Sequence, residues 1–335
     1  MKKYASLLLL ALFLNGCDDG DLTIETIEFA DVTATSCDTT NTLLYKLKTQ
    51  EALLLQLPSG DLINNPTKDG APITYTIDDS NYRVFYRSYT GEITKSNICD
   101  AIPPSSPTVT DEWRAKAGII QITTKADYKT PAPEDGHTEI TGYTHNIIFN
   151  NITWKKPTGP DVIEPVYSFG DFKTTVTPVV VTFSDDVAEY CETYKKVYND
   201  NTTSALVIEN FDTENLIKNE DTPTGVPRKS VINLNKTTNK LYYRIYKNPL
   251  PEKTNADYFC LQTTPSTPTV SSTWVGEDGT MDVSGTIEVT TTSTTSNFKH
   301  KIVLKKVKLT KGNSTFNLAN EFVLGTVTTV ATTTP

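Results

Sequence analysis

The chain contains three histidines, which are the first side chains to consider for catalysis or metal binding. His137 lies in the segment PEDGHTE, near Glu134, Asp135 and Glu139. One histidine with loosely spaced acids does not define a coordination geometry, so we interpret this segment as a polar loop. The sequence has no HExxH, GxSxG or glycine-rich phosphate loop. We therefore expect no catalytic residue, no metal and no cofactor, and we predict that the protein is not an enzyme.

The other two histidines begin two similar segments. His145 opens HNIIFNNITW and His300 opens HKIVLKKVKL. A residue that occurs at the same place in two copies of a segment can be explained by a structural role as well as by a role in a functional site. No serine or cysteine signature lies near either histidine, so we favour a structural or surface role over catalysis.

Two predicted strands, VFYRSY and LYYRIY, carry aromatic residues on either side of an arginine. Alternation along a strand places every second side chain on the same face. The candidate binding residues are Phe85, Arg87, Tyr89, Tyr242, Arg244 and Tyr246. Aromatic planes beside a guanidinium suit sugar rings or an aromatic side chain of a partner protein. The alternative, which we favour, is cross-strand packing with the arginine extending from the sheet.

The second half of the chain also carries a lysine-rich stretch. Its members are Lys299, Lys301, Lys305, Lys306, Lys308 and Lys311. A basic stripe on an acidic protein could meet an anionic glycan or a lipid headgroup. We favour a second interpretation, in which the lysines protect an edge strand from aggregation.

Several segments occur twice in the same order. SPTVTDEW recurs as TPTVSSTW, VFYRSY as LYYRIY, GIIQITT as GTIEVTT, and HNIIFNNITW as HKIVLKKVKL. The spacing between partners changes only at polar, loop-like stretches, so we interpret the chain as a tandem duplication. The predicted organisation is a signal peptide at 1–16, an acidic tether at 17–24, one domain at 25–176, a second at 177–330 and a disordered tail at 331–335.

Each copy consists of short, alternating segments rich in β-branched and aromatic residues, separated by clusters of Pro, Gly, Asn and Asp. About seven strands without a long amphipathic helix predict an all-β protein of two homologous β-sandwich domains. The domains are immunoglobulin-like but not true immunoglobulin domains. Trp113 and Trp274 follow the second cysteine of their copy, whereas the immunoglobulin tryptophan lies between the two cysteines.

Four of the five cysteines occupy matching positions in the two copies. This equivalence selects the pairs Cys37–Cys99 and Cys191–Cys260 from the three possible connectivities. Disulfides are favoured in an exported protein, and no CxxC motif suggests a redox or metal role. Cross-links over such separations stabilise a domain by about 4 kcal/mol in the entropic model.

The N-terminus has the pattern of an export signal. Lys2 and Lys3 precede ten apolar residues, which are too few to span a bilayer. The following Leu14-Asn15-Gly16-Cys17 resembles the lipobox of bacterial lipoproteins, whose cysteine is lipidated and becomes the first mature residue. The resemblance implies lipidation at Cys17, and the lipid chains would be the membrane attachment.

The acids after Cys17 resemble the surface-export signal of lipoproteins of the Bacteroidota, although in other Gram-negative groups an Asp there implies inner-membrane retention. We therefore expect an outer-membrane lipoprotein exposed at the cell surface. The segment Asp38-Thr39-Thr40 likewise resembles the O-glycosylation motif of that phylum, at Thr39. The net charge of −9 gives no general attraction to nucleic acid, which we exclude as a partner.

The expected function is surface binding or adhesion, with a glycan or a protein as the ligand. In layout the chain resembles the accessory lipoproteins of glycan-uptake systems. The alternative is a structural or assembly subunit, either fimbrial or secretion-associated, because fimbrial subunits of the Bacteroidota are also lipoprotein precursors with two sandwich domains. Those precursors are cleaved after an early arginine. The first arginine here is Arg83, inside the first predicted domain, which counts against that alternative.

Overall fold

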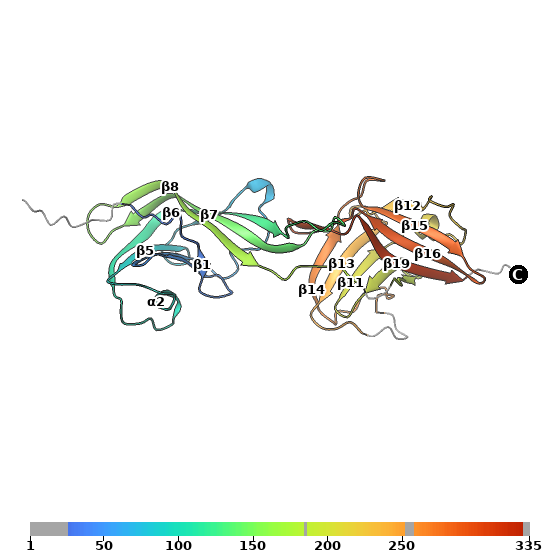
Figure 1. Cartoon of the computed structure of the whole chain (residues 1–335), viewed down its shortest axis with the longest axis horizontal. Helices are drawn as coiled ribbons and strands as arrows, with labels where there is room; N and C mark the ends of the chain where they lie inside the picture. Colours follow the sequence, from blue (N-terminus) through green and yellow to red (C-terminus); the bar gives the residue numbers. More distant parts are fainter. Residues whose placement is uncertain (1–25, 184–185, 252–257, 331–335) are drawn as a thin grey trace, which may run out of the picture. The chain divides into compact units, whose positions relative to one another are not determined.

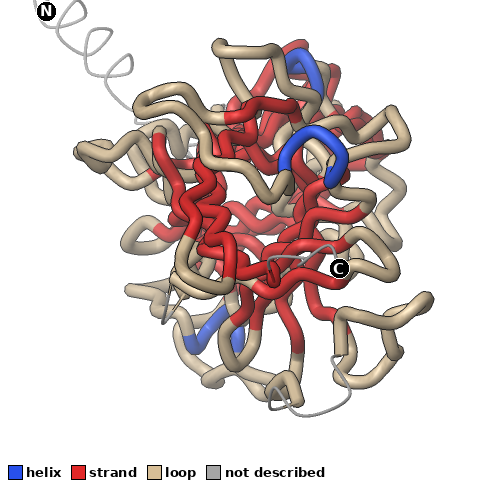
Figure 2. The backbone as a smooth tube through the Cα atoms, turned by 90° about the vertical axis from the view of Figure 1, so that its right-hand side faces the viewer, coloured by secondary structure: helices blue, strands red, loops and turns tan. Residues whose placement is uncertain are grey.

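The computed structural model of the protein describes residues 26–183, 186–251 and 258–330 (Figure 1). Strands are the main regular secondary structure, and Figure 2 draws them in red. The described helical segments are single turns, at Lys68–Gly70 (η1), Ser96–Cys99 (α2) and Thr213–Leu216 (α3). The predicted all-β fold class is confirmed. The signal peptide, Cys17, the tether and the tail lie outside the described residues.

The first sheet has eight strands in the order β1-β2-β3-β5-β6-β7-β8, with β4 paired to β6. The strands are β1 (Thr35–Ser36), β2 (Leu43–Leu47), β3 (Glu51–Gln56), β4 (Ile73–Thr76), β5 (Arg83–Tyr89), β6 (Val109–Tyr128), β7 (Ile140–Lys155) and β8 (Val162–Thr175). Because β6 runs for 20 residues, it pairs with β5, β4 and β7 and joins two sets of strands into one sheet.

The second half of the chain forms two separate sheets. The seven-stranded sheet has the order β18-β17-β14-β13-β11-β10-β9, and the four-stranded sheet has the order β12-β15-β16-β19. The strands are β9 (Glu189–Cys191), β10 (Lys196–Asp200), β11 (Ser204–Glu209), β12 (Arg228–Val231), β13 (Lys240–Tyr246), β14 (Val270–Gly276), β15 (Thr286–Ser293), β16 (Asn297–Lys305), β17 (Lys308–Lys311), β18 (Ser314–Asn317) and β19 (Glu321–Val330).

The two halves have the same strand pairing. The array β1-β2-β3-β5-β6 corresponds to β9-β10-β11-β13-β14, and the array β4-β6-β7-β8 corresponds to β12-β15-β16-β19. The single strand β6 is replaced in the second half by β14 and β15, which the segment 277–285 separates. The register also recurs: Tyr86 pairs with Trp113 and Tyr243 with Trp274, and a bulge follows in each case.

The chain divides into two compact units. The first contains residues 26–59, 75–120 and 148–170, and the second contains 60–74, 121–147 and the described residues from 171 to 330. The long strands β6, β7 and β8 contribute residues to both. The division into tandem domains at 176 and 177 stays a prediction.

The core of the second unit lies between its two sheets. Leu206, Leu241 and Trp274 come from one sheet and belong to the same buried cluster as Ile287 and Ile302 from the other. Shared burial of two sheets is the arrangement of a β-sandwich. In the first unit, the buried Tyr86 ring makes edge contacts with Phe29 and Trp113, at centroid distances of 6.4 and 5.7 Å.

A second apolar cluster covers the outer face of each five-stranded array, away from the main core. In the first unit Cys99 lies in the segment between β5 and β6, and its disulfide to Cys37 holds this segment over the sheet. The Cys191–Cys260 disulfide does the same for the segment between β13 and β14. Both predicted disulfides are confirmed. We call residues 90–108, and in the second half the described residues 247–251 and 258–269, the covering segments.

The helical turns in the described part of the chain are too short to cross a membrane.

Candidate functional site

The candidate aromatic residues lie mostly beneath the covering segments. Phe85 and Tyr89 are each 6% exposed, and they pack with Tyr45, Leu54 and Ile93. Tyr246, at 4% exposure, takes the same place under the second covering segment. The alternation therefore puts these rings on one face, and the fold then buries the rings of Phe85, Tyr89 and Tyr246. This geometry supports the packing interpretation for the aromatic rings.

The arginine between these rings remains open to solvent and belongs to a larger group. Arg87 Nε and Arg114 Nε each lie 2.6 Å from a different oxygen of Glu112. Burial of Glu112 opposes its ionisation, but the hydrogen bonds from both guanidinium groups prevail and lower its pKa below the ordinary value. Arg83 is the third guanidinium on this face, 3.6 Å from Asp79 Oδ1.

Arg83 and Arg114 were not among the site residues predicted from the sequence. Arg83 stands two residues before Phe85 on β5, so strand alternation alone could have placed it on the same face. Arg114 lies opposite Phe85 on β6, and this pairing depends on the register between the two strands. Register is a tertiary feature that the sequence did not reveal.

The corresponding arginine of the second half has a simpler environment. Arg244 Nη2 lies 3.1 Å from Glu209 Oε1, and its guanidinium lies 4.6 Å from the Tyr242 ring centroid. Tyr242 is half-buried, and burial raises the pKa of its phenol. Arg244 thus has one carboxylate partner and one ring.

His145 is fully buried, and its hydrogen-bonded network reaches the surface at Asn64. Its Nδ1 is 2.9 Å from Thr124 Oγ1, and its Nε2 is 3.3 Å from Thr174 Oγ1 and 3.2 Å from Asn64 Oδ1. The Thr174 hydroxyl donates to Asn64 Oδ1 at 2.7 Å. Burial lowers the pKa of His145 to about 4, so the ring is neutral at pH 7.

His300 repeats this network. Its Nδ1 is 2.9 Å from Thr291 Oγ1 and its Nε2 is 2.9 Å from Thr329 Oγ1, while the Thr329 hydroxyl donates to Asn219 Oδ1 at 2.6 Å. Burial, followed by the nearby Arg228, lowers the pKa of His300 to about 4. Two buried neutral rings with both nitrogens engaged fit a structural role.

His137 is held between two carboxylates. Its Nδ1 lies 2.5 Å from Asp135 Oδ1 and its Nε2 lies 3.1 Å from Glu139 Oε1. The hydrogen bond with Glu139 raises the pKa of His137, and Asp135 adds to this effect. His137 and Asp135 also line a cavity of about 210 Å³ within the second unit. Because both ring nitrogens already have partners, neither is free to activate a nucleophile.

The described residues contain no group of three or more His, Cys, Asp or Glu side chains that could hold a metal ion.

The edge-strand interpretation of the lysines is wrong for β16 and β17. Strand β16 pairs with β15 on one side and β19 on the other, and β17 lies between β14 and β18. Lys299 and Lys301 are exposed on β16. Lys305 and Lys308 form ion pairs, with Glu288 and Glu277 among their partners.

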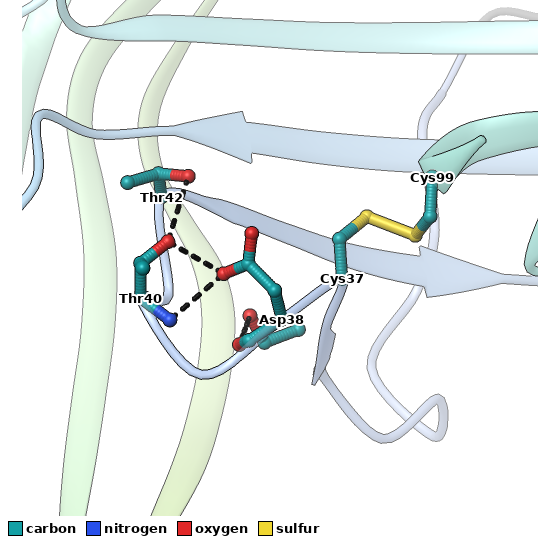
Figure 3. The surroundings of a disulfide bond; sticks show 6 residues. Cys37, Asp38, Thr40, Thr42 and Cys99 are labelled. Carbon is teal, nitrogen blue, oxygen red and sulfur yellow. Dashed lines mark hydrogen bonds between the residues drawn. A yellow bond between two sulfur atoms is a disulfide. The ribbon is translucent and has the colours of Figure 1, made fainter. Parts of the chain in front are cut away.

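The turn at Asp38 lies beside the first disulfide (Figure 3). Asp38 Oδ1 accepts hydrogen bonds from the backbone N–H and the hydroxyl of Thr40, at 2.8 and 2.6 Å. These bonds lower the pKa of Asp38. Thr39 is exposed in this turn, and its glycosylation stays a prediction.

No protein-family model, curated protein or solved structure matches this chain.

Proposed function

We propose that the protein is a lipid-anchored component of the outer membrane that binds a glycan or a protein at the cell surface. The anchor is proposed from the run Leu14-Asn15-Gly16-Cys17, and surface exposure from the acids that follow it. The observation that carries the binding role is the set of partly exposed guanidinium groups of Arg83, Arg87 and Arg114 on the outer face of the first array. Guanidinium groups bind carboxylates, sulfates and aromatic planes.

The anchor is tested by replacing the lipidated cysteine. The Cys17→Ala variant is expected to lose incorporation of radiolabelled palmitate and to leave the membrane fraction. Brief protease treatment of intact cells is expected to degrade the wild-type protein while a periplasmic marker stays intact. Wild-type protein that carries no label would refute the anchor, and labelled protein protected from the protease would refute surface exposure alone.

The binding role is tested with the full chain purified in detergent. A printed array of glycans and pull-down from extracellular protein fractions are expected to yield a ligand whose retention falls on Arg87→Ala. Arg244→Ala shows whether the second half contributes. A high-mass ladder of the protein in cell extracts, with no ligand found, would indicate an assembly subunit and contradict the binding role.

A further inference from the structure

Three guanidinium groups surround the ring of Phe85. The centroid of this ring lies 4.4 Å from the guanidinium carbon of Arg83 and 5.7 Å from those of Arg87 and Arg114. The ring itself is buried, and it makes cation–π contacts with the three guanidinium groups. We call Arg83, Arg87 and Arg114 the arginine cluster. Their side chains are 29%, 31% and 49% exposed, so a ligand can reach them.

The nearby carboxylates do not satisfy the arginine cluster completely. Glu112 receives one hydrogen bond from Arg87 and one from Arg114, which uses both of its oxygens. Arg83 Nε is buried without a hydrogen-bond partner, and Asp79 Oδ1 lies 3.6 Å away. Three cations thus face two acids, in a protein of net charge −9. Because this Nε is buried, as is the unpartnered Nη1 of Arg244 in the second half, a ligand would meet the exposed nitrogens of the cluster.

The same place in the second half shows that the sheet does not require this cluster. Arg87 pairs across the sheet with Glu112, and Phe85 pairs with Arg114. The corresponding pairs on β13 and β14 are Arg244 with Thr273 and Tyr242 with Val275. Lys240 stands where Arg83 does, but neither Glu112 nor Arg114 has a charged counterpart. The added charges are therefore a property of this one surface and not of the shared fold.

We propose that the arginine cluster binds the carboxylate or sulfate groups of an acidic polysaccharide. This inference rests on the proposed binding function and names its ligand class. A guanidinium group can donate two parallel hydrogen bonds to two oxygens of a carboxylate or sulfate, and Arg83 and Arg114 carry such donors. Glu112 holds Arg87 and Arg114 in place and thereby orders the site before a ligand arrives.

An extended sugar chain fits this surface better than a protein partner does. The guanidinium carbons of Arg83 and Arg87 lie 4.4 and 5.7 Å from the same ring centroid, so the cluster concentrates its charge at one place, which suits an anionic group that a linear chain carries. A specific protein interface usually has an apolar centre, whereas Phe85 is covered and the cluster presents cations. The net charge of −9 opposes every long polyanion alike, so double-stranded DNA is included in the test as a competing polyanion.

The test compares two variants that remove the same charge from two surfaces of the full chain in detergent. Arg83→Gln/Arg114→Gln changes the arginine cluster, and Lys299→Gln/Lys301→Gln removes two exposed cations from β16. The probes are polygalacturonate, a sulfated galactan, neutral dextran and double-stranded DNA, immobilised for a biosensor measurement. Arg114→Gln alone, at the most exposed of the three positions, is the second variant should the double arginine variant unfold.

We expect the wild-type protein to bind one of the two acidic polysaccharides and to lose affinity as NaCl rises from about 50 to about 500 mM. The double arginine variant is expected to bind at least tenfold more weakly, and the lysine variant to stay within twofold of wild type. Circular dichroism should show the same fold in all proteins.

Equal loss in the two double variants, or equal binding to DNA, would show general attraction to polyanions and overturn the inference. Unchanged affinity in the arginine variants would also overturn it. If the wild-type protein ignores both acidic polysaccharides but binds a neutral glycan or a protein, this inference fails and the proposed function stands. If it binds no ligand of any class, both fail.

Discussion

The outer faces of the two five-stranded arrays are alike in their buried tyrosine and disulfide and different in their charged side chains. In both arrays a tyrosine, Tyr89 or Tyr246, is buried under a covering segment that one cysteine pair holds in place. The first array also has three guanidinium groups around Phe85, whereas the second has only Arg244 over Tyr242. Features that recur in both arrays are explained by the fold, and the feature that differs is the better place to look for function.

The buried histidines extend this comparison to the other sheet of each half. His145 and His300 have the same kinds of partner at both ring nitrogens, namely a threonine hydroxyl on each side and an asparagine beyond the second threonine. Neither network reaches solvent through its histidine, which is fully buried. The recurrence therefore marks a structural element, and the following predictions test how closely the two halves agree.

The largest expected effect is the loss of a disulfide. Replacing Cys37 and Cys99 by serine should lower the free energy of unfolding by about 4 kcal/mol, and the Cys191 and Cys260 double variant should lose the same amount. The sequence separations of 62 and 69 residues are similar, and the entropic cost depends weakly on length. Urea unfolding of the full chain measures both losses. A difference above about 2 kcal/mol between them would show that the covering segments are not equivalent.

The next effect concerns the two histidine networks. At pH 7.5, His145→Phe and His300→Phe should each cost about 2 kcal/mol, because the ring volume is kept while buried hydroxyls lose their partners. His137→Gln is the control, since His137 is partly exposed, and its cost should stay under about 1 kcal/mol. Thermal unfolding by circular dichroism measures all three. Should His300→Phe be neutral while His145→Phe is not, the networks would differ in role despite their shared geometry.

The pH dependence of stability tests the same histidines through their protons. Their pKa values are lowered to about 4 in the folded protein, from 6.5, so the unfolded chain binds more protons between these values. Stability should therefore be full above pH 6.5 and fall as the pH drops towards 4, with each histidine adding up to about 1.4 kcal/mol per pH unit to the slope. His145→Phe and His300→Phe should each remove an equal part of that slope.

His137 should have the opposite sign. Its pKa is raised by Glu139 and Asp135, so its contribution to stability is present below pH 6.5 and is lost as the pH rises through the raised value. The His137→Gln variant therefore serves as a control in the same titration. A slope unchanged in both phenylalanine variants would contradict the buried, neutral state of the two rings.

The sequence was sufficient for features that repeat or alternate. Matching positions in the two copies identified both disulfides, and alternation placed Phe85, Arg87 and Tyr89 on one face. It was not sufficient for burial of that face, because the covering segment is fixed by a bond between residues 62 positions apart. The charge and alternation of a strand can be read from its own residues. The covering segment that buries one face of the strand is a tertiary contact, which cannot be read in this way.

Strand order was the other missing information. Arg114 joins Arg87 at Glu112 only because β6 pairs with β5 in one register, and Lys301 lies on an interior strand because β19 completes the sheet beside β16. A lysine-rich segment is equally compatible with an edge or an interior strand until its neighbours are known. The sequence therefore contains the three arginines of the cluster but does not show that they lie together.

The smallest expected effect separates the role of the ion pairs in stability from their role in binding. Double-mutant cycles on Arg87 with Glu112, and on Arg244 with Glu209, should give coupling energies under about 1 kcal/mol, because all four side chains are partly exposed. Both couplings should weaken in high salt, as solvent-accessible pairs do. Unfolding of the single and double glutamine variants measures them. A coupling well above this value at Arg87 alone would mean that the first half needs its charges for folding, which would remove the contrast on which the arginine cluster was assigned to binding.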